Sequence, residues 1–297
     1  MSKTISRYTT GRAGVLRYRG RQTVNAIMLV LTGVAAFSAI VPLAWIILYV
    51  TQQGTSFLSL DFFTRLPTPV GVPGGGVANA LLGSAITVGL ACLFAIPIGL
   101  LAAIYVAYHP NTPLGIAVRF GTDVLSGVPS IVVGIFAYTL VVLPMGGFSA
   151  LAGGVALTVI MLPTVIRATE EMIKLVPNNL REGSLALGAP EWKTSFQVIV
   201  PAAISGIVTG VMLGIARVAG EAAPMLFTAF GNPFWNARMD RPIATLPHMI
   251  FTYAISPYED WHAKAWTTAL VLITLVLSLN ILARLIVAWR QKSTGTL

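Results

Sequence analysis

Residues 168–206 read ATEEMIKLVPNNLREGSLALGAPEWKTSFQVIVPAAISG and connect two long apolar runs of the chain. Within them, residues 180–188 predict a short helix that ends at Gly188, with Pro190 close behind. A plain connection between two helices needs only about two to eight residues. This stretch is far longer. It therefore predicts a folded helix-turn-helix element that does not cross a membrane and that provides a contact surface.

The composition places this element in an integral membrane protein. The chain is 56% hydrophobic and 10% charged, with a mean hydropathy of +0.81, whereas a typical soluble domain is about 25% charged. A soluble protein of 297 residues could not bury that much apolar surface. The single cysteine, Cys92, excludes an intrachain disulfide and indicates neither a metal site nor a redox site.

Apolar runs long enough to cross about 30 Å of hydrocarbon recur along the chain. They lie at roughly 24–50, 79–108, 124–143, 149–173, 202–230 and 265–289. The connections 51–78 and 231–264 are rich in proline, glycine and aromatic residues, while 144–149 is a tight turn and 109–123 and 174–201 lie on the opposite side. The sequence therefore predicts an all-α integral membrane protein with six transmembrane helices.

Basic residues set the expected orientation. The tail before the first acidic residue, Asp61, holds six of them: Lys3, Arg7, Arg12, Arg17, Arg19 and Arg21. Cytoplasmic segments of membrane proteins carry an excess of Lys and Arg. We therefore expect residues 1–23 to form a basic cytoplasmic tail resting on anionic lipid, and residues 291–297 a cytoplasmic C-terminus. The tail has no aromatic interleaving or nucleic-acid-binding motif, so no nucleic acid is expected as a partner.

The first apolar run is expected to remain in the protein. It is too long for the core of a signal peptide and lacks a clear small-residue cleavage site. Residues 24–78 are thus assigned to a first transmembrane helix and an outer loop.

Two apolar segments carry an arginine and a glutamate at a spacing that predicts one helix face. Arg167 and Glu170 are three residues apart, and Arg217 and Glu221 are four apart. A charge at the bilayer centre costs at least about 2.5 kcal/mol on insertion scales. One interpretation is a structural ion pair within each helix. The other is an anion pathway, in which guanidinium groups bind an oxyanion and carboxylates keep that binding weak enough for release.

The carboxylates also affect which oxyanion such a pathway would transport. Phosphate retains protons near neutral pH, and a carboxylate accepts hydrogen bonds from them. Sulfate is fully ionised and would only be repelled. This chemistry favours phosphate, while sulfate and molybdate stay open as alternatives.

Energy for transport is expected to come from a partner. The chain has no G-x4-G-K-[ST] loop to hold ATP phosphates and no nucleophile–base constellation. His109, His248 and His262 lie in or beside predicted loops and are not expected to be catalytic. The sequence therefore predicts no enzyme and no cofactor bound by this chain.

The helix-turn-helix connection resembles the cytoplasmic EAA loop of permeases of ATP-binding-cassette (ABC) importers, E-A-A-x3-G-x9-I-x-L-P. Glu182, Gly188 and Pro201 match the glutamate, glycine and proline of that pattern. The positions that depart from it are Gly183 and Ser184, in place of alanines, and Val198 and Val200, in place of isoleucine and leucine. The literal triplet at residues 221–223 lies in the predicted fifth span and is not this loop.

This resemblance implies the type I importer permease (MetI-like) fold over residues 79–290, with residues 180–201 as the coupling loop. In such permeases the short helix docks in a cleft of a separate ATPase, which binds ATP and Mg²⁺. Leu185 and Leu187 are the apolar anchors expected for such docking. The alternative is a helix that lies on the membrane interface.

Three runs together resemble the PstA family of bacterial phosphate permeases: GVPSIVVGIFAYTLVV (127–142), LPTVIRATEEMIKLVPNNLREGSLALGA (162–189) and GIARVAGEAAPMLFTA (214–229). The resemblance covers about residues 79–290. It implies that inorganic phosphate is transported and that Arg167, Glu170 and Arg217 serve its passage. Glu221 is added because of its predicted helix face.

The same resemblance implies a bacterial plasma (inner) membrane location and three protein partners: a second homologous permease (PstC type), a cytoplasmic ATPase dimer (PstB type) and an extracytoplasmic phosphate-binding protein (PstS type). The aromatic outer loops, with Trp235 and Trp261, would either dock the binding protein or form an interfacial belt. A proton-coupled carrier using Glu170 and Glu221, and a membrane scaffold, remain as alternatives. Neither would need the loop 180–201.

Overall fold

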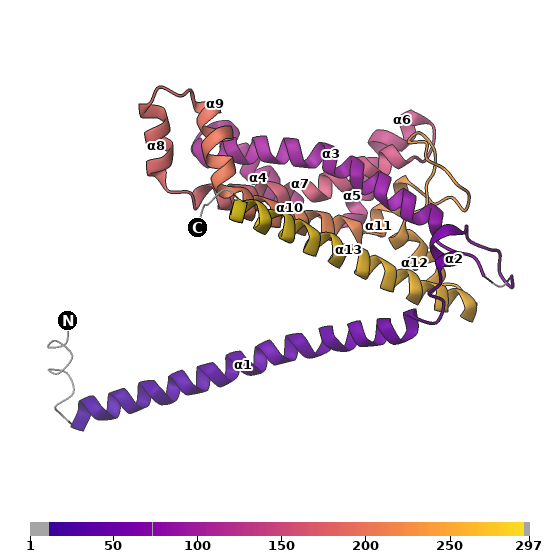
Figure 1. Ribbon diagram of the computed structural model, residues 1–297, viewed down its shortest axis with the longest axis horizontal. Coiled ribbons are helices and arrows are strands. Elements are labelled where there is room, and N and C mark those ends of the chain that lie inside the picture. Colours follow the sequence, from indigo (N-terminus) through magenta and orange to yellow (C-terminus); the bar gives the residue numbers. More distant parts are fainter. Residues whose placement is uncertain (1–11, 73, 294–297) are drawn as a thin grey trace. The chain divides into compact units, whose positions relative to one another are not determined.

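The computed structural model describes residues 12–72 and 74–293, and its regular elements are helices (Figure 1). Lys3 and Arg7 of the predicted basic tail lie outside the described residues. The chain divides into two units, Met1–Gln52 and Gln53–Leu297, which are described separately.

The first unit is formed by α1 (Arg12–Gly54), so helix begins within the segment predicted as a tail. Its part from Gly20 to Gly54 is long and apolar enough to cross a membrane. Hydroxyl groups in this segment donate to carbonyls one turn earlier, for example Thr32 to Met28 O at 2.8 Å and Thr51 to Ile47 O at 2.7 Å. These polar side chains therefore need no water.

Four long helices of the second unit are also apolar enough to span. They are α3 (Ala78–Tyr108), α7 (Ala150–Lys174), α13 (Glu259–Ser293) and a composite helix from Glu191 to Ala219. The composite helix consists of α9 (Glu191–Lys193), the π-helical turn η3 (Thr194–Ile199) and α10 (Val200–Ala219). With α1, the described chain has five candidate spans, or six if a bent pair crosses as one. The predicted all-α membrane fold is confirmed.

The prediction of a third span as one continuous helix at residues 124–143 is wrong. Helix α4 (Pro113–Gly127) covers most of the predicted connection 109–123 and meets the segment Ser130–Met145 at a bend of 108°. That segment comprises α5 (Ser130–Ala137), η2 (Tyr138–Val142) and α6 (Leu143–Met145). Pro129 lies at the bend and disfavours helical backbone at Val128, which is extended (φ −75°, ψ 129°).

The predicted fifth span, 202–230, is also interrupted. Helix α10 ends at Ala219, with Gly220 as its C-cap, and helix resumes only at α11 (Ala223–Thr228). Pro224 in the first turn of α11 cannot donate a backbone hydrogen bond to a preceding turn, which separates the two helices. Glu221 therefore lies in the break and not on the face of α10.

Glycines set the packing of α10 against α7. A Cβ atom on Gly206 would meet the Met172 side chain at 2.0 Å, and one on Gly210 would meet the Ala168 Cβ at 2.3 Å. Gly214 faces Met161 in the same register. These glycines therefore allow α10 to pack closely against α7.

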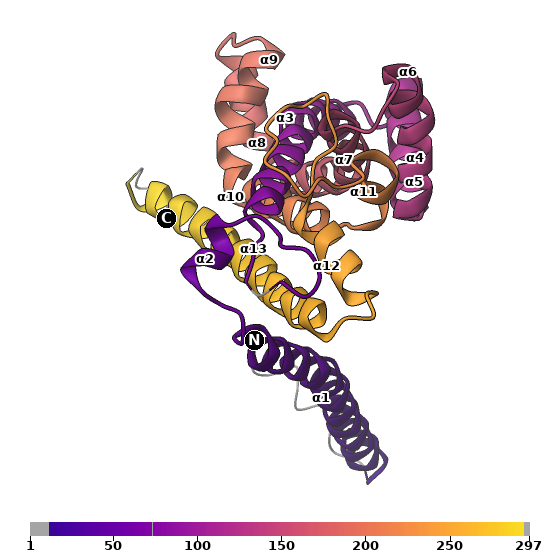
Figure 2. The same ribbon diagram turned by 90° about the vertical axis from the view of Figure 1, so that its right-hand side faces the viewer.

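The second unit has two distinct ends (Figure 1). Helices α8 (Asn178–Ala186) and α9 lie at one end, whereas α2 (Leu60–Thr64) and α12 (Leu246–Ala254) lie at the other. Figure 2 shows α4, α5 and α6 on one flank of α7, with α10 and α13 on the other. Helix α7 is thus the central helix of this unit.

Candidate functional site

Charged side chains gather around a cavity of about 160 Å³ between α4 and α7. The residues that line it are Arg119, Thr122, Asp123, Ile166, Arg167, Glu170, Glu171 and Lys174. We call them the α4–α7 charge cluster. It combines three cations with three carboxylates, so its formal charges balance.

Glu170 is the buried centre of this cluster. Its side chain is 10% exposed, and Oε1 accepts from Arg119 Nη2 at 2.5 Å, Arg119 Nε at 3.1 Å and Lys174 Nζ at 2.5 Å. The predicted pair between Arg167 and Glu170 is not formed. Their spacing permits it, but a cation from α4 and another one turn farther along α7 already hold the carboxylate.

Arg167 instead forms an ion pair with Asp123 of α4. The two side chains are 51% and 56% exposed, in contrast to Glu170. The cluster therefore has a buried pairing centred on Glu170 and an accessible pairing centred on Arg167.

The second predicted pair is also absent. Arg217 lies in the last turn of α10 and is exposed, whereas Glu221 is half-buried in the break after that helix. Among the ion pairs of the described residues, none joins these two side chains. The break explains this, because the i,i+4 relation holds only within one helix.

Arg217 and Arg167 lie at different levels of the bundle. Gly214 packs opposite Met161, so Arg217, farther along α10, lies at or beyond the level of Met161. From Met161 to Arg167 the α7 axis advances about 9 Å at ~1.5 Å per residue. The structure thus brings Arg167 and Glu170 into one cluster and leaves Arg217 and Glu221 outside it.

Four charged members of the cluster were not found from the sequence: Arg119, Asp123, Glu171 and Lys174. Arg119 and Asp123 fall in the predicted connection 109–123, and Lys174 begins the predicted connection 174–201. The available signal was the four-residue spacing of Arg119 and Asp123, which becomes one helix face once α4 is recognised as a helix.

The predicted coupling loop folds as expected. Helix α8 ends at Ala186, and Gly188 follows with φ +83°, the left-handed conformation that favours glycine. Gly188 N donates to Leu185 O at 2.9 Å and Ala189 N to Ser184 O at 3.2 Å, which closes the helix end. Pro201 lies in the first turn of α10, where a missing N–H costs little.

Side-chain contacts hold the coupling loop in place. Arg181 Nη2 lies 3.2 Å from Glu191 Oε1, and the Arg181 guanidinium also lies 4.8 Å above the Tyr108 ring. Ser184 and Thr194 hydroxyls are 2.8 Å apart. The loop is therefore fixed against the bundle.

The tip of this loop is apolar and accessible. Leu187 is 90% exposed, Glu182 is exposed and Leu185 is half-buried. Of the two predicted anchors, Leu187 is the more exposed.

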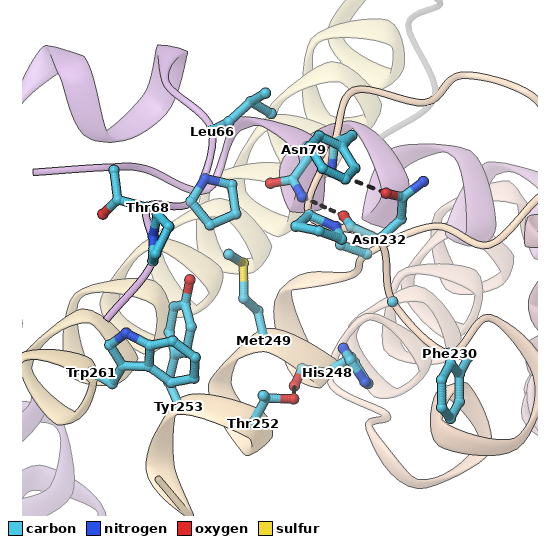
Figure 3. A pocket seen from close by; sticks show the side chains of 16 residues that line it. Leu66, Thr68, Asn79, Phe230, Asn232, His248, Met249, Thr252, Tyr253 and Trp261 are labelled. Atoms are coloured by element: carbon cyan, nitrogen blue, oxygen red, sulfur yellow. Dashed lines mark hydrogen bonds between the residues drawn. The ribbon is translucent and has the colours of Figure 1, made fainter. Parts of the chain in front are cut away.

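A larger cavity, of about 540 Å³, lies at the end of the unit that carries α12 (Figure 1). Figure 3 shows its lining from close by. The cavity is lined by α12 and by residues 66–69 and 230–234, and Asn79 Nδ2 donates to Asn232 O at 2.6 Å beside it. Burial lowers the pKa of His248 and raises the pKa of Tyr253 to about 12. None of its lining side chains is therefore charged near neutral pH, so this apolar cavity does not suit an anion.

Comparison with known proteins agrees with this geometry. Residues 95–292 match the family described as binding-protein-dependent transport system inner membrane component. A solved inward-facing structure of the MetNI methionine ABC transporter aligns with a TM-score of 0.57 at 20% identity, over 71% of this chain and 94% of that one. An amino acid ABC transporter aligns with a TM-score of 0.52 at 17% identity, over 71% and 91%. The fold is that of a membrane permease of ABC importers.

Closer relatives narrow the class. The phosphate transport system permease protein PstA of Yersinia pestis is 44% identical over 272 residues, 91% of this chain and 92% of the relative. That of Haemophilus influenzae is 43% identical over 271 residues, 91% and 96%. The chain belongs to the PstA family of inner-membrane permeases. The predicted family is confirmed.

Proposed function

We propose that this chain is the permease subunit of an ATP-driven importer of inorganic phosphate and forms half of its anion pathway. The observation that carries the proposal is the α4–α7 charge cluster, which holds an accessible guanidinium inside a permease whose relatives are named phosphate permeases. A guanidinium stays charged at any physiological pH and donates two parallel hydrogen bonds that match a tetrahedral oxyanion.

Two arginines would contact the anion in succession. Helix α7 runs toward the coupling loop and α10 runs away from it, so Arg167 lies nearer that loop and Arg217, in the last turn of α10, lies farther from it. An anion entering from the α12 end would therefore meet Arg217 first and Arg167 second. Glu170 would balance the cations of the cluster, and Glu221 would lie beside the break through which α10 leads to α11.

The coupling loop would transmit the movement of a partner ATPase to the membrane helices. We place α8 and α9 in the cytoplasm, with both termini, because the connections on that side hold most of the basic residues. The exposed Leu187 would insert into a groove of an ATPase dimer of PstB type, which would bind ATP and Mg²⁺. A permease of PstC type would cover the exposed arginines, and a binding protein of PstS type would deliver phosphate at the α12 end.

Uptake by the assembled transporter in proteoliposomes tests this proposal. We expect ATP-dependent uptake of radiolabelled phosphate that a tenfold excess of unlabelled sulfate or molybdate does not reduce. If sulfate competes as well as unlabelled phosphate, the substrate class is oxyanions in general and not phosphate. Uptake that persists without the ATPase would rule out an ATP-driven mechanism.

A further inference from the structure

The carboxylate that contacts Arg167 comes from another helix. Helical spacing pointed to Glu170, but Glu170 already accepts from Arg119 and Lys174. The guanidinium of Arg167 is left to Asp123 on α4, across the cavity of the charge cluster.

The two pairings in this cluster differ in how easily they can be broken. A mobile anion that displaced Glu170 from Arg119 and Lys174 would leave a 10% exposed carboxylate without its two cations, and leaving a buried charge unpaired is costly. Arg167 and Asp123 are both more than half exposed, and exposed ion pairs contribute little net stability. A mobile anion can therefore exchange with Asp123 but not with Glu170.

We propose that Asp123 occupies, in the anion-free permease, the place that the transported oxyanion takes on Arg167, and that the anion displaces it. The inference rests on the proposed function and adds a residue to it. Carboxylate and phosphate both accept from a guanidinium in the same fork geometry. Asp123 is thus an internal competitor, which weakens anion binding at Arg167 and returns to the guanidinium as the anion leaves.

A purely structural role for Asp123 gives a different expectation. If the pair only tied α4 to α7, its loss would lower the maximal uptake rate without strengthening anion binding. A competitor has the opposite signature in binding, because its removal leaves Arg167 free for the anion. The split between KM and Vmax therefore distinguishes the two roles.

The test measures initial rates of radiolabelled phosphate uptake by the complete transporter in proteoliposomes, for wild type, Asp123→Asn and Asp123→Glu. Asparagine keeps the size of the side chain and removes its charge. We expect Asp123→Asn to lower KM about two- to fivefold, the range that follows from the strength of an exposed ion pair, and to lower Vmax because release is slower. Asp123→Glu restores both values toward wild type.

Ser126→Ala, a neutral substitution on the same helix, is the control. It removes a hydroxyl that donates to Thr122 O at 2.8 Å and leaves the charges of the cluster in place. We expect it to leave KM and Vmax unchanged. An unchanged KM in Asp123→Asn, with or without a lower Vmax, would overturn the competitor role.

Failure of the proposed substrate gives a separate result. If the wild-type transporter takes up sulfate instead of phosphate, the same comparison is made with sulfate. A lower KM for sulfate in Asp123→Asn would then support the competitor role of Asp123 and reject phosphate as the substrate. An unchanged KM would reject both.

Discussion

At the scale of single residues, two side chains of α7 pair with side chains of α4: Glu170 with Arg119, and Arg167 with Asp123. The spacing of Arg167 and Glu170 predicted that they share one helix face, and both line the cavity of the charge cluster. Their partners could not be predicted, because helical periodicity gives the face of one helix and not the side chains opposite. Arg119 and Asp123 reach the cluster from α4, which was predicted as a connection.

His248 gives a prediction about pH at this scale. Burial lowers its pKa, so the folded protein binds this proton less readily than the unfolded chain, whose imidazole pKa is about 6.5. The free energy of unfolding should therefore fall as the pH drops below about 6.5. Thermal unfolding of the purified protein at pH 7.5 and 5.5 measures this, and His248→Gln should show a smaller drop. The same drop in both proteins would contradict the assignment to His248.

At the scale of elements, the short helix α8 was predicted well because its signals are local. Gly188 and Pro190 end it as expected, and Gly188 adopts φ +83° with no atom near the place of a Cβ. Its requirement for glycine is thus conformational and not steric. Long apolar runs are different, since their length does not show where a helix bends.

Substitutions at Gly188 test the coupling loop. Asparagine tolerates the left-handed conformation, whereas a β-branched valine does not. We expect Gly188→Asn to retain the ATPase and ATP-driven uptake, and Gly188→Val to lose much of both. The amount of ATPase that co-purifies with each variant is the measurement. Wild-type recovery and uptake in Gly188→Val would contradict a docking role for the loop.

Packing between α7 and α10 gives a second prediction for elements. Gly210→Ala places a Cβ 2.3 Å from the Ala168 Cβ and should destabilise the protein by about 1–3 kcal/mol, as overpacking does. Gly89→Ala is the control, because no atom lies within 4 Å of its Cβ. Removing a helical glycine there should stabilise α3 by about 0.5–1 kcal/mol. Thermal midpoints in one detergent compare them, and shifts in the same direction would refute the packing argument.

At the scale of the whole molecule, composition and hydropathy identified the class of protein, and the coupling loop narrowed it. The bends at Pro129 and at Gly220–Pro224 were missed because proline and glycine are tolerated within membrane helices, so their presence did not require a break. The break matters for the site, since it removes Glu221 from the face that carries Arg217.

In the proposed importer, the transported anion binds the Arg167 guanidinium. The rate of phosphate uptake by the assembled transporter carrying Arg167→Gln measures this, with Arg284→Gln in α13, outside the charge cluster, as the control. A hydrogen bond to a charged group contributes about 1.5–3 kcal/mol, so we expect uptake to fall at least about tenfold in Arg167→Gln. The control should match wild type. Wild-type uptake in a correctly assembled Arg167→Gln transporter would rule out anion binding at Arg167.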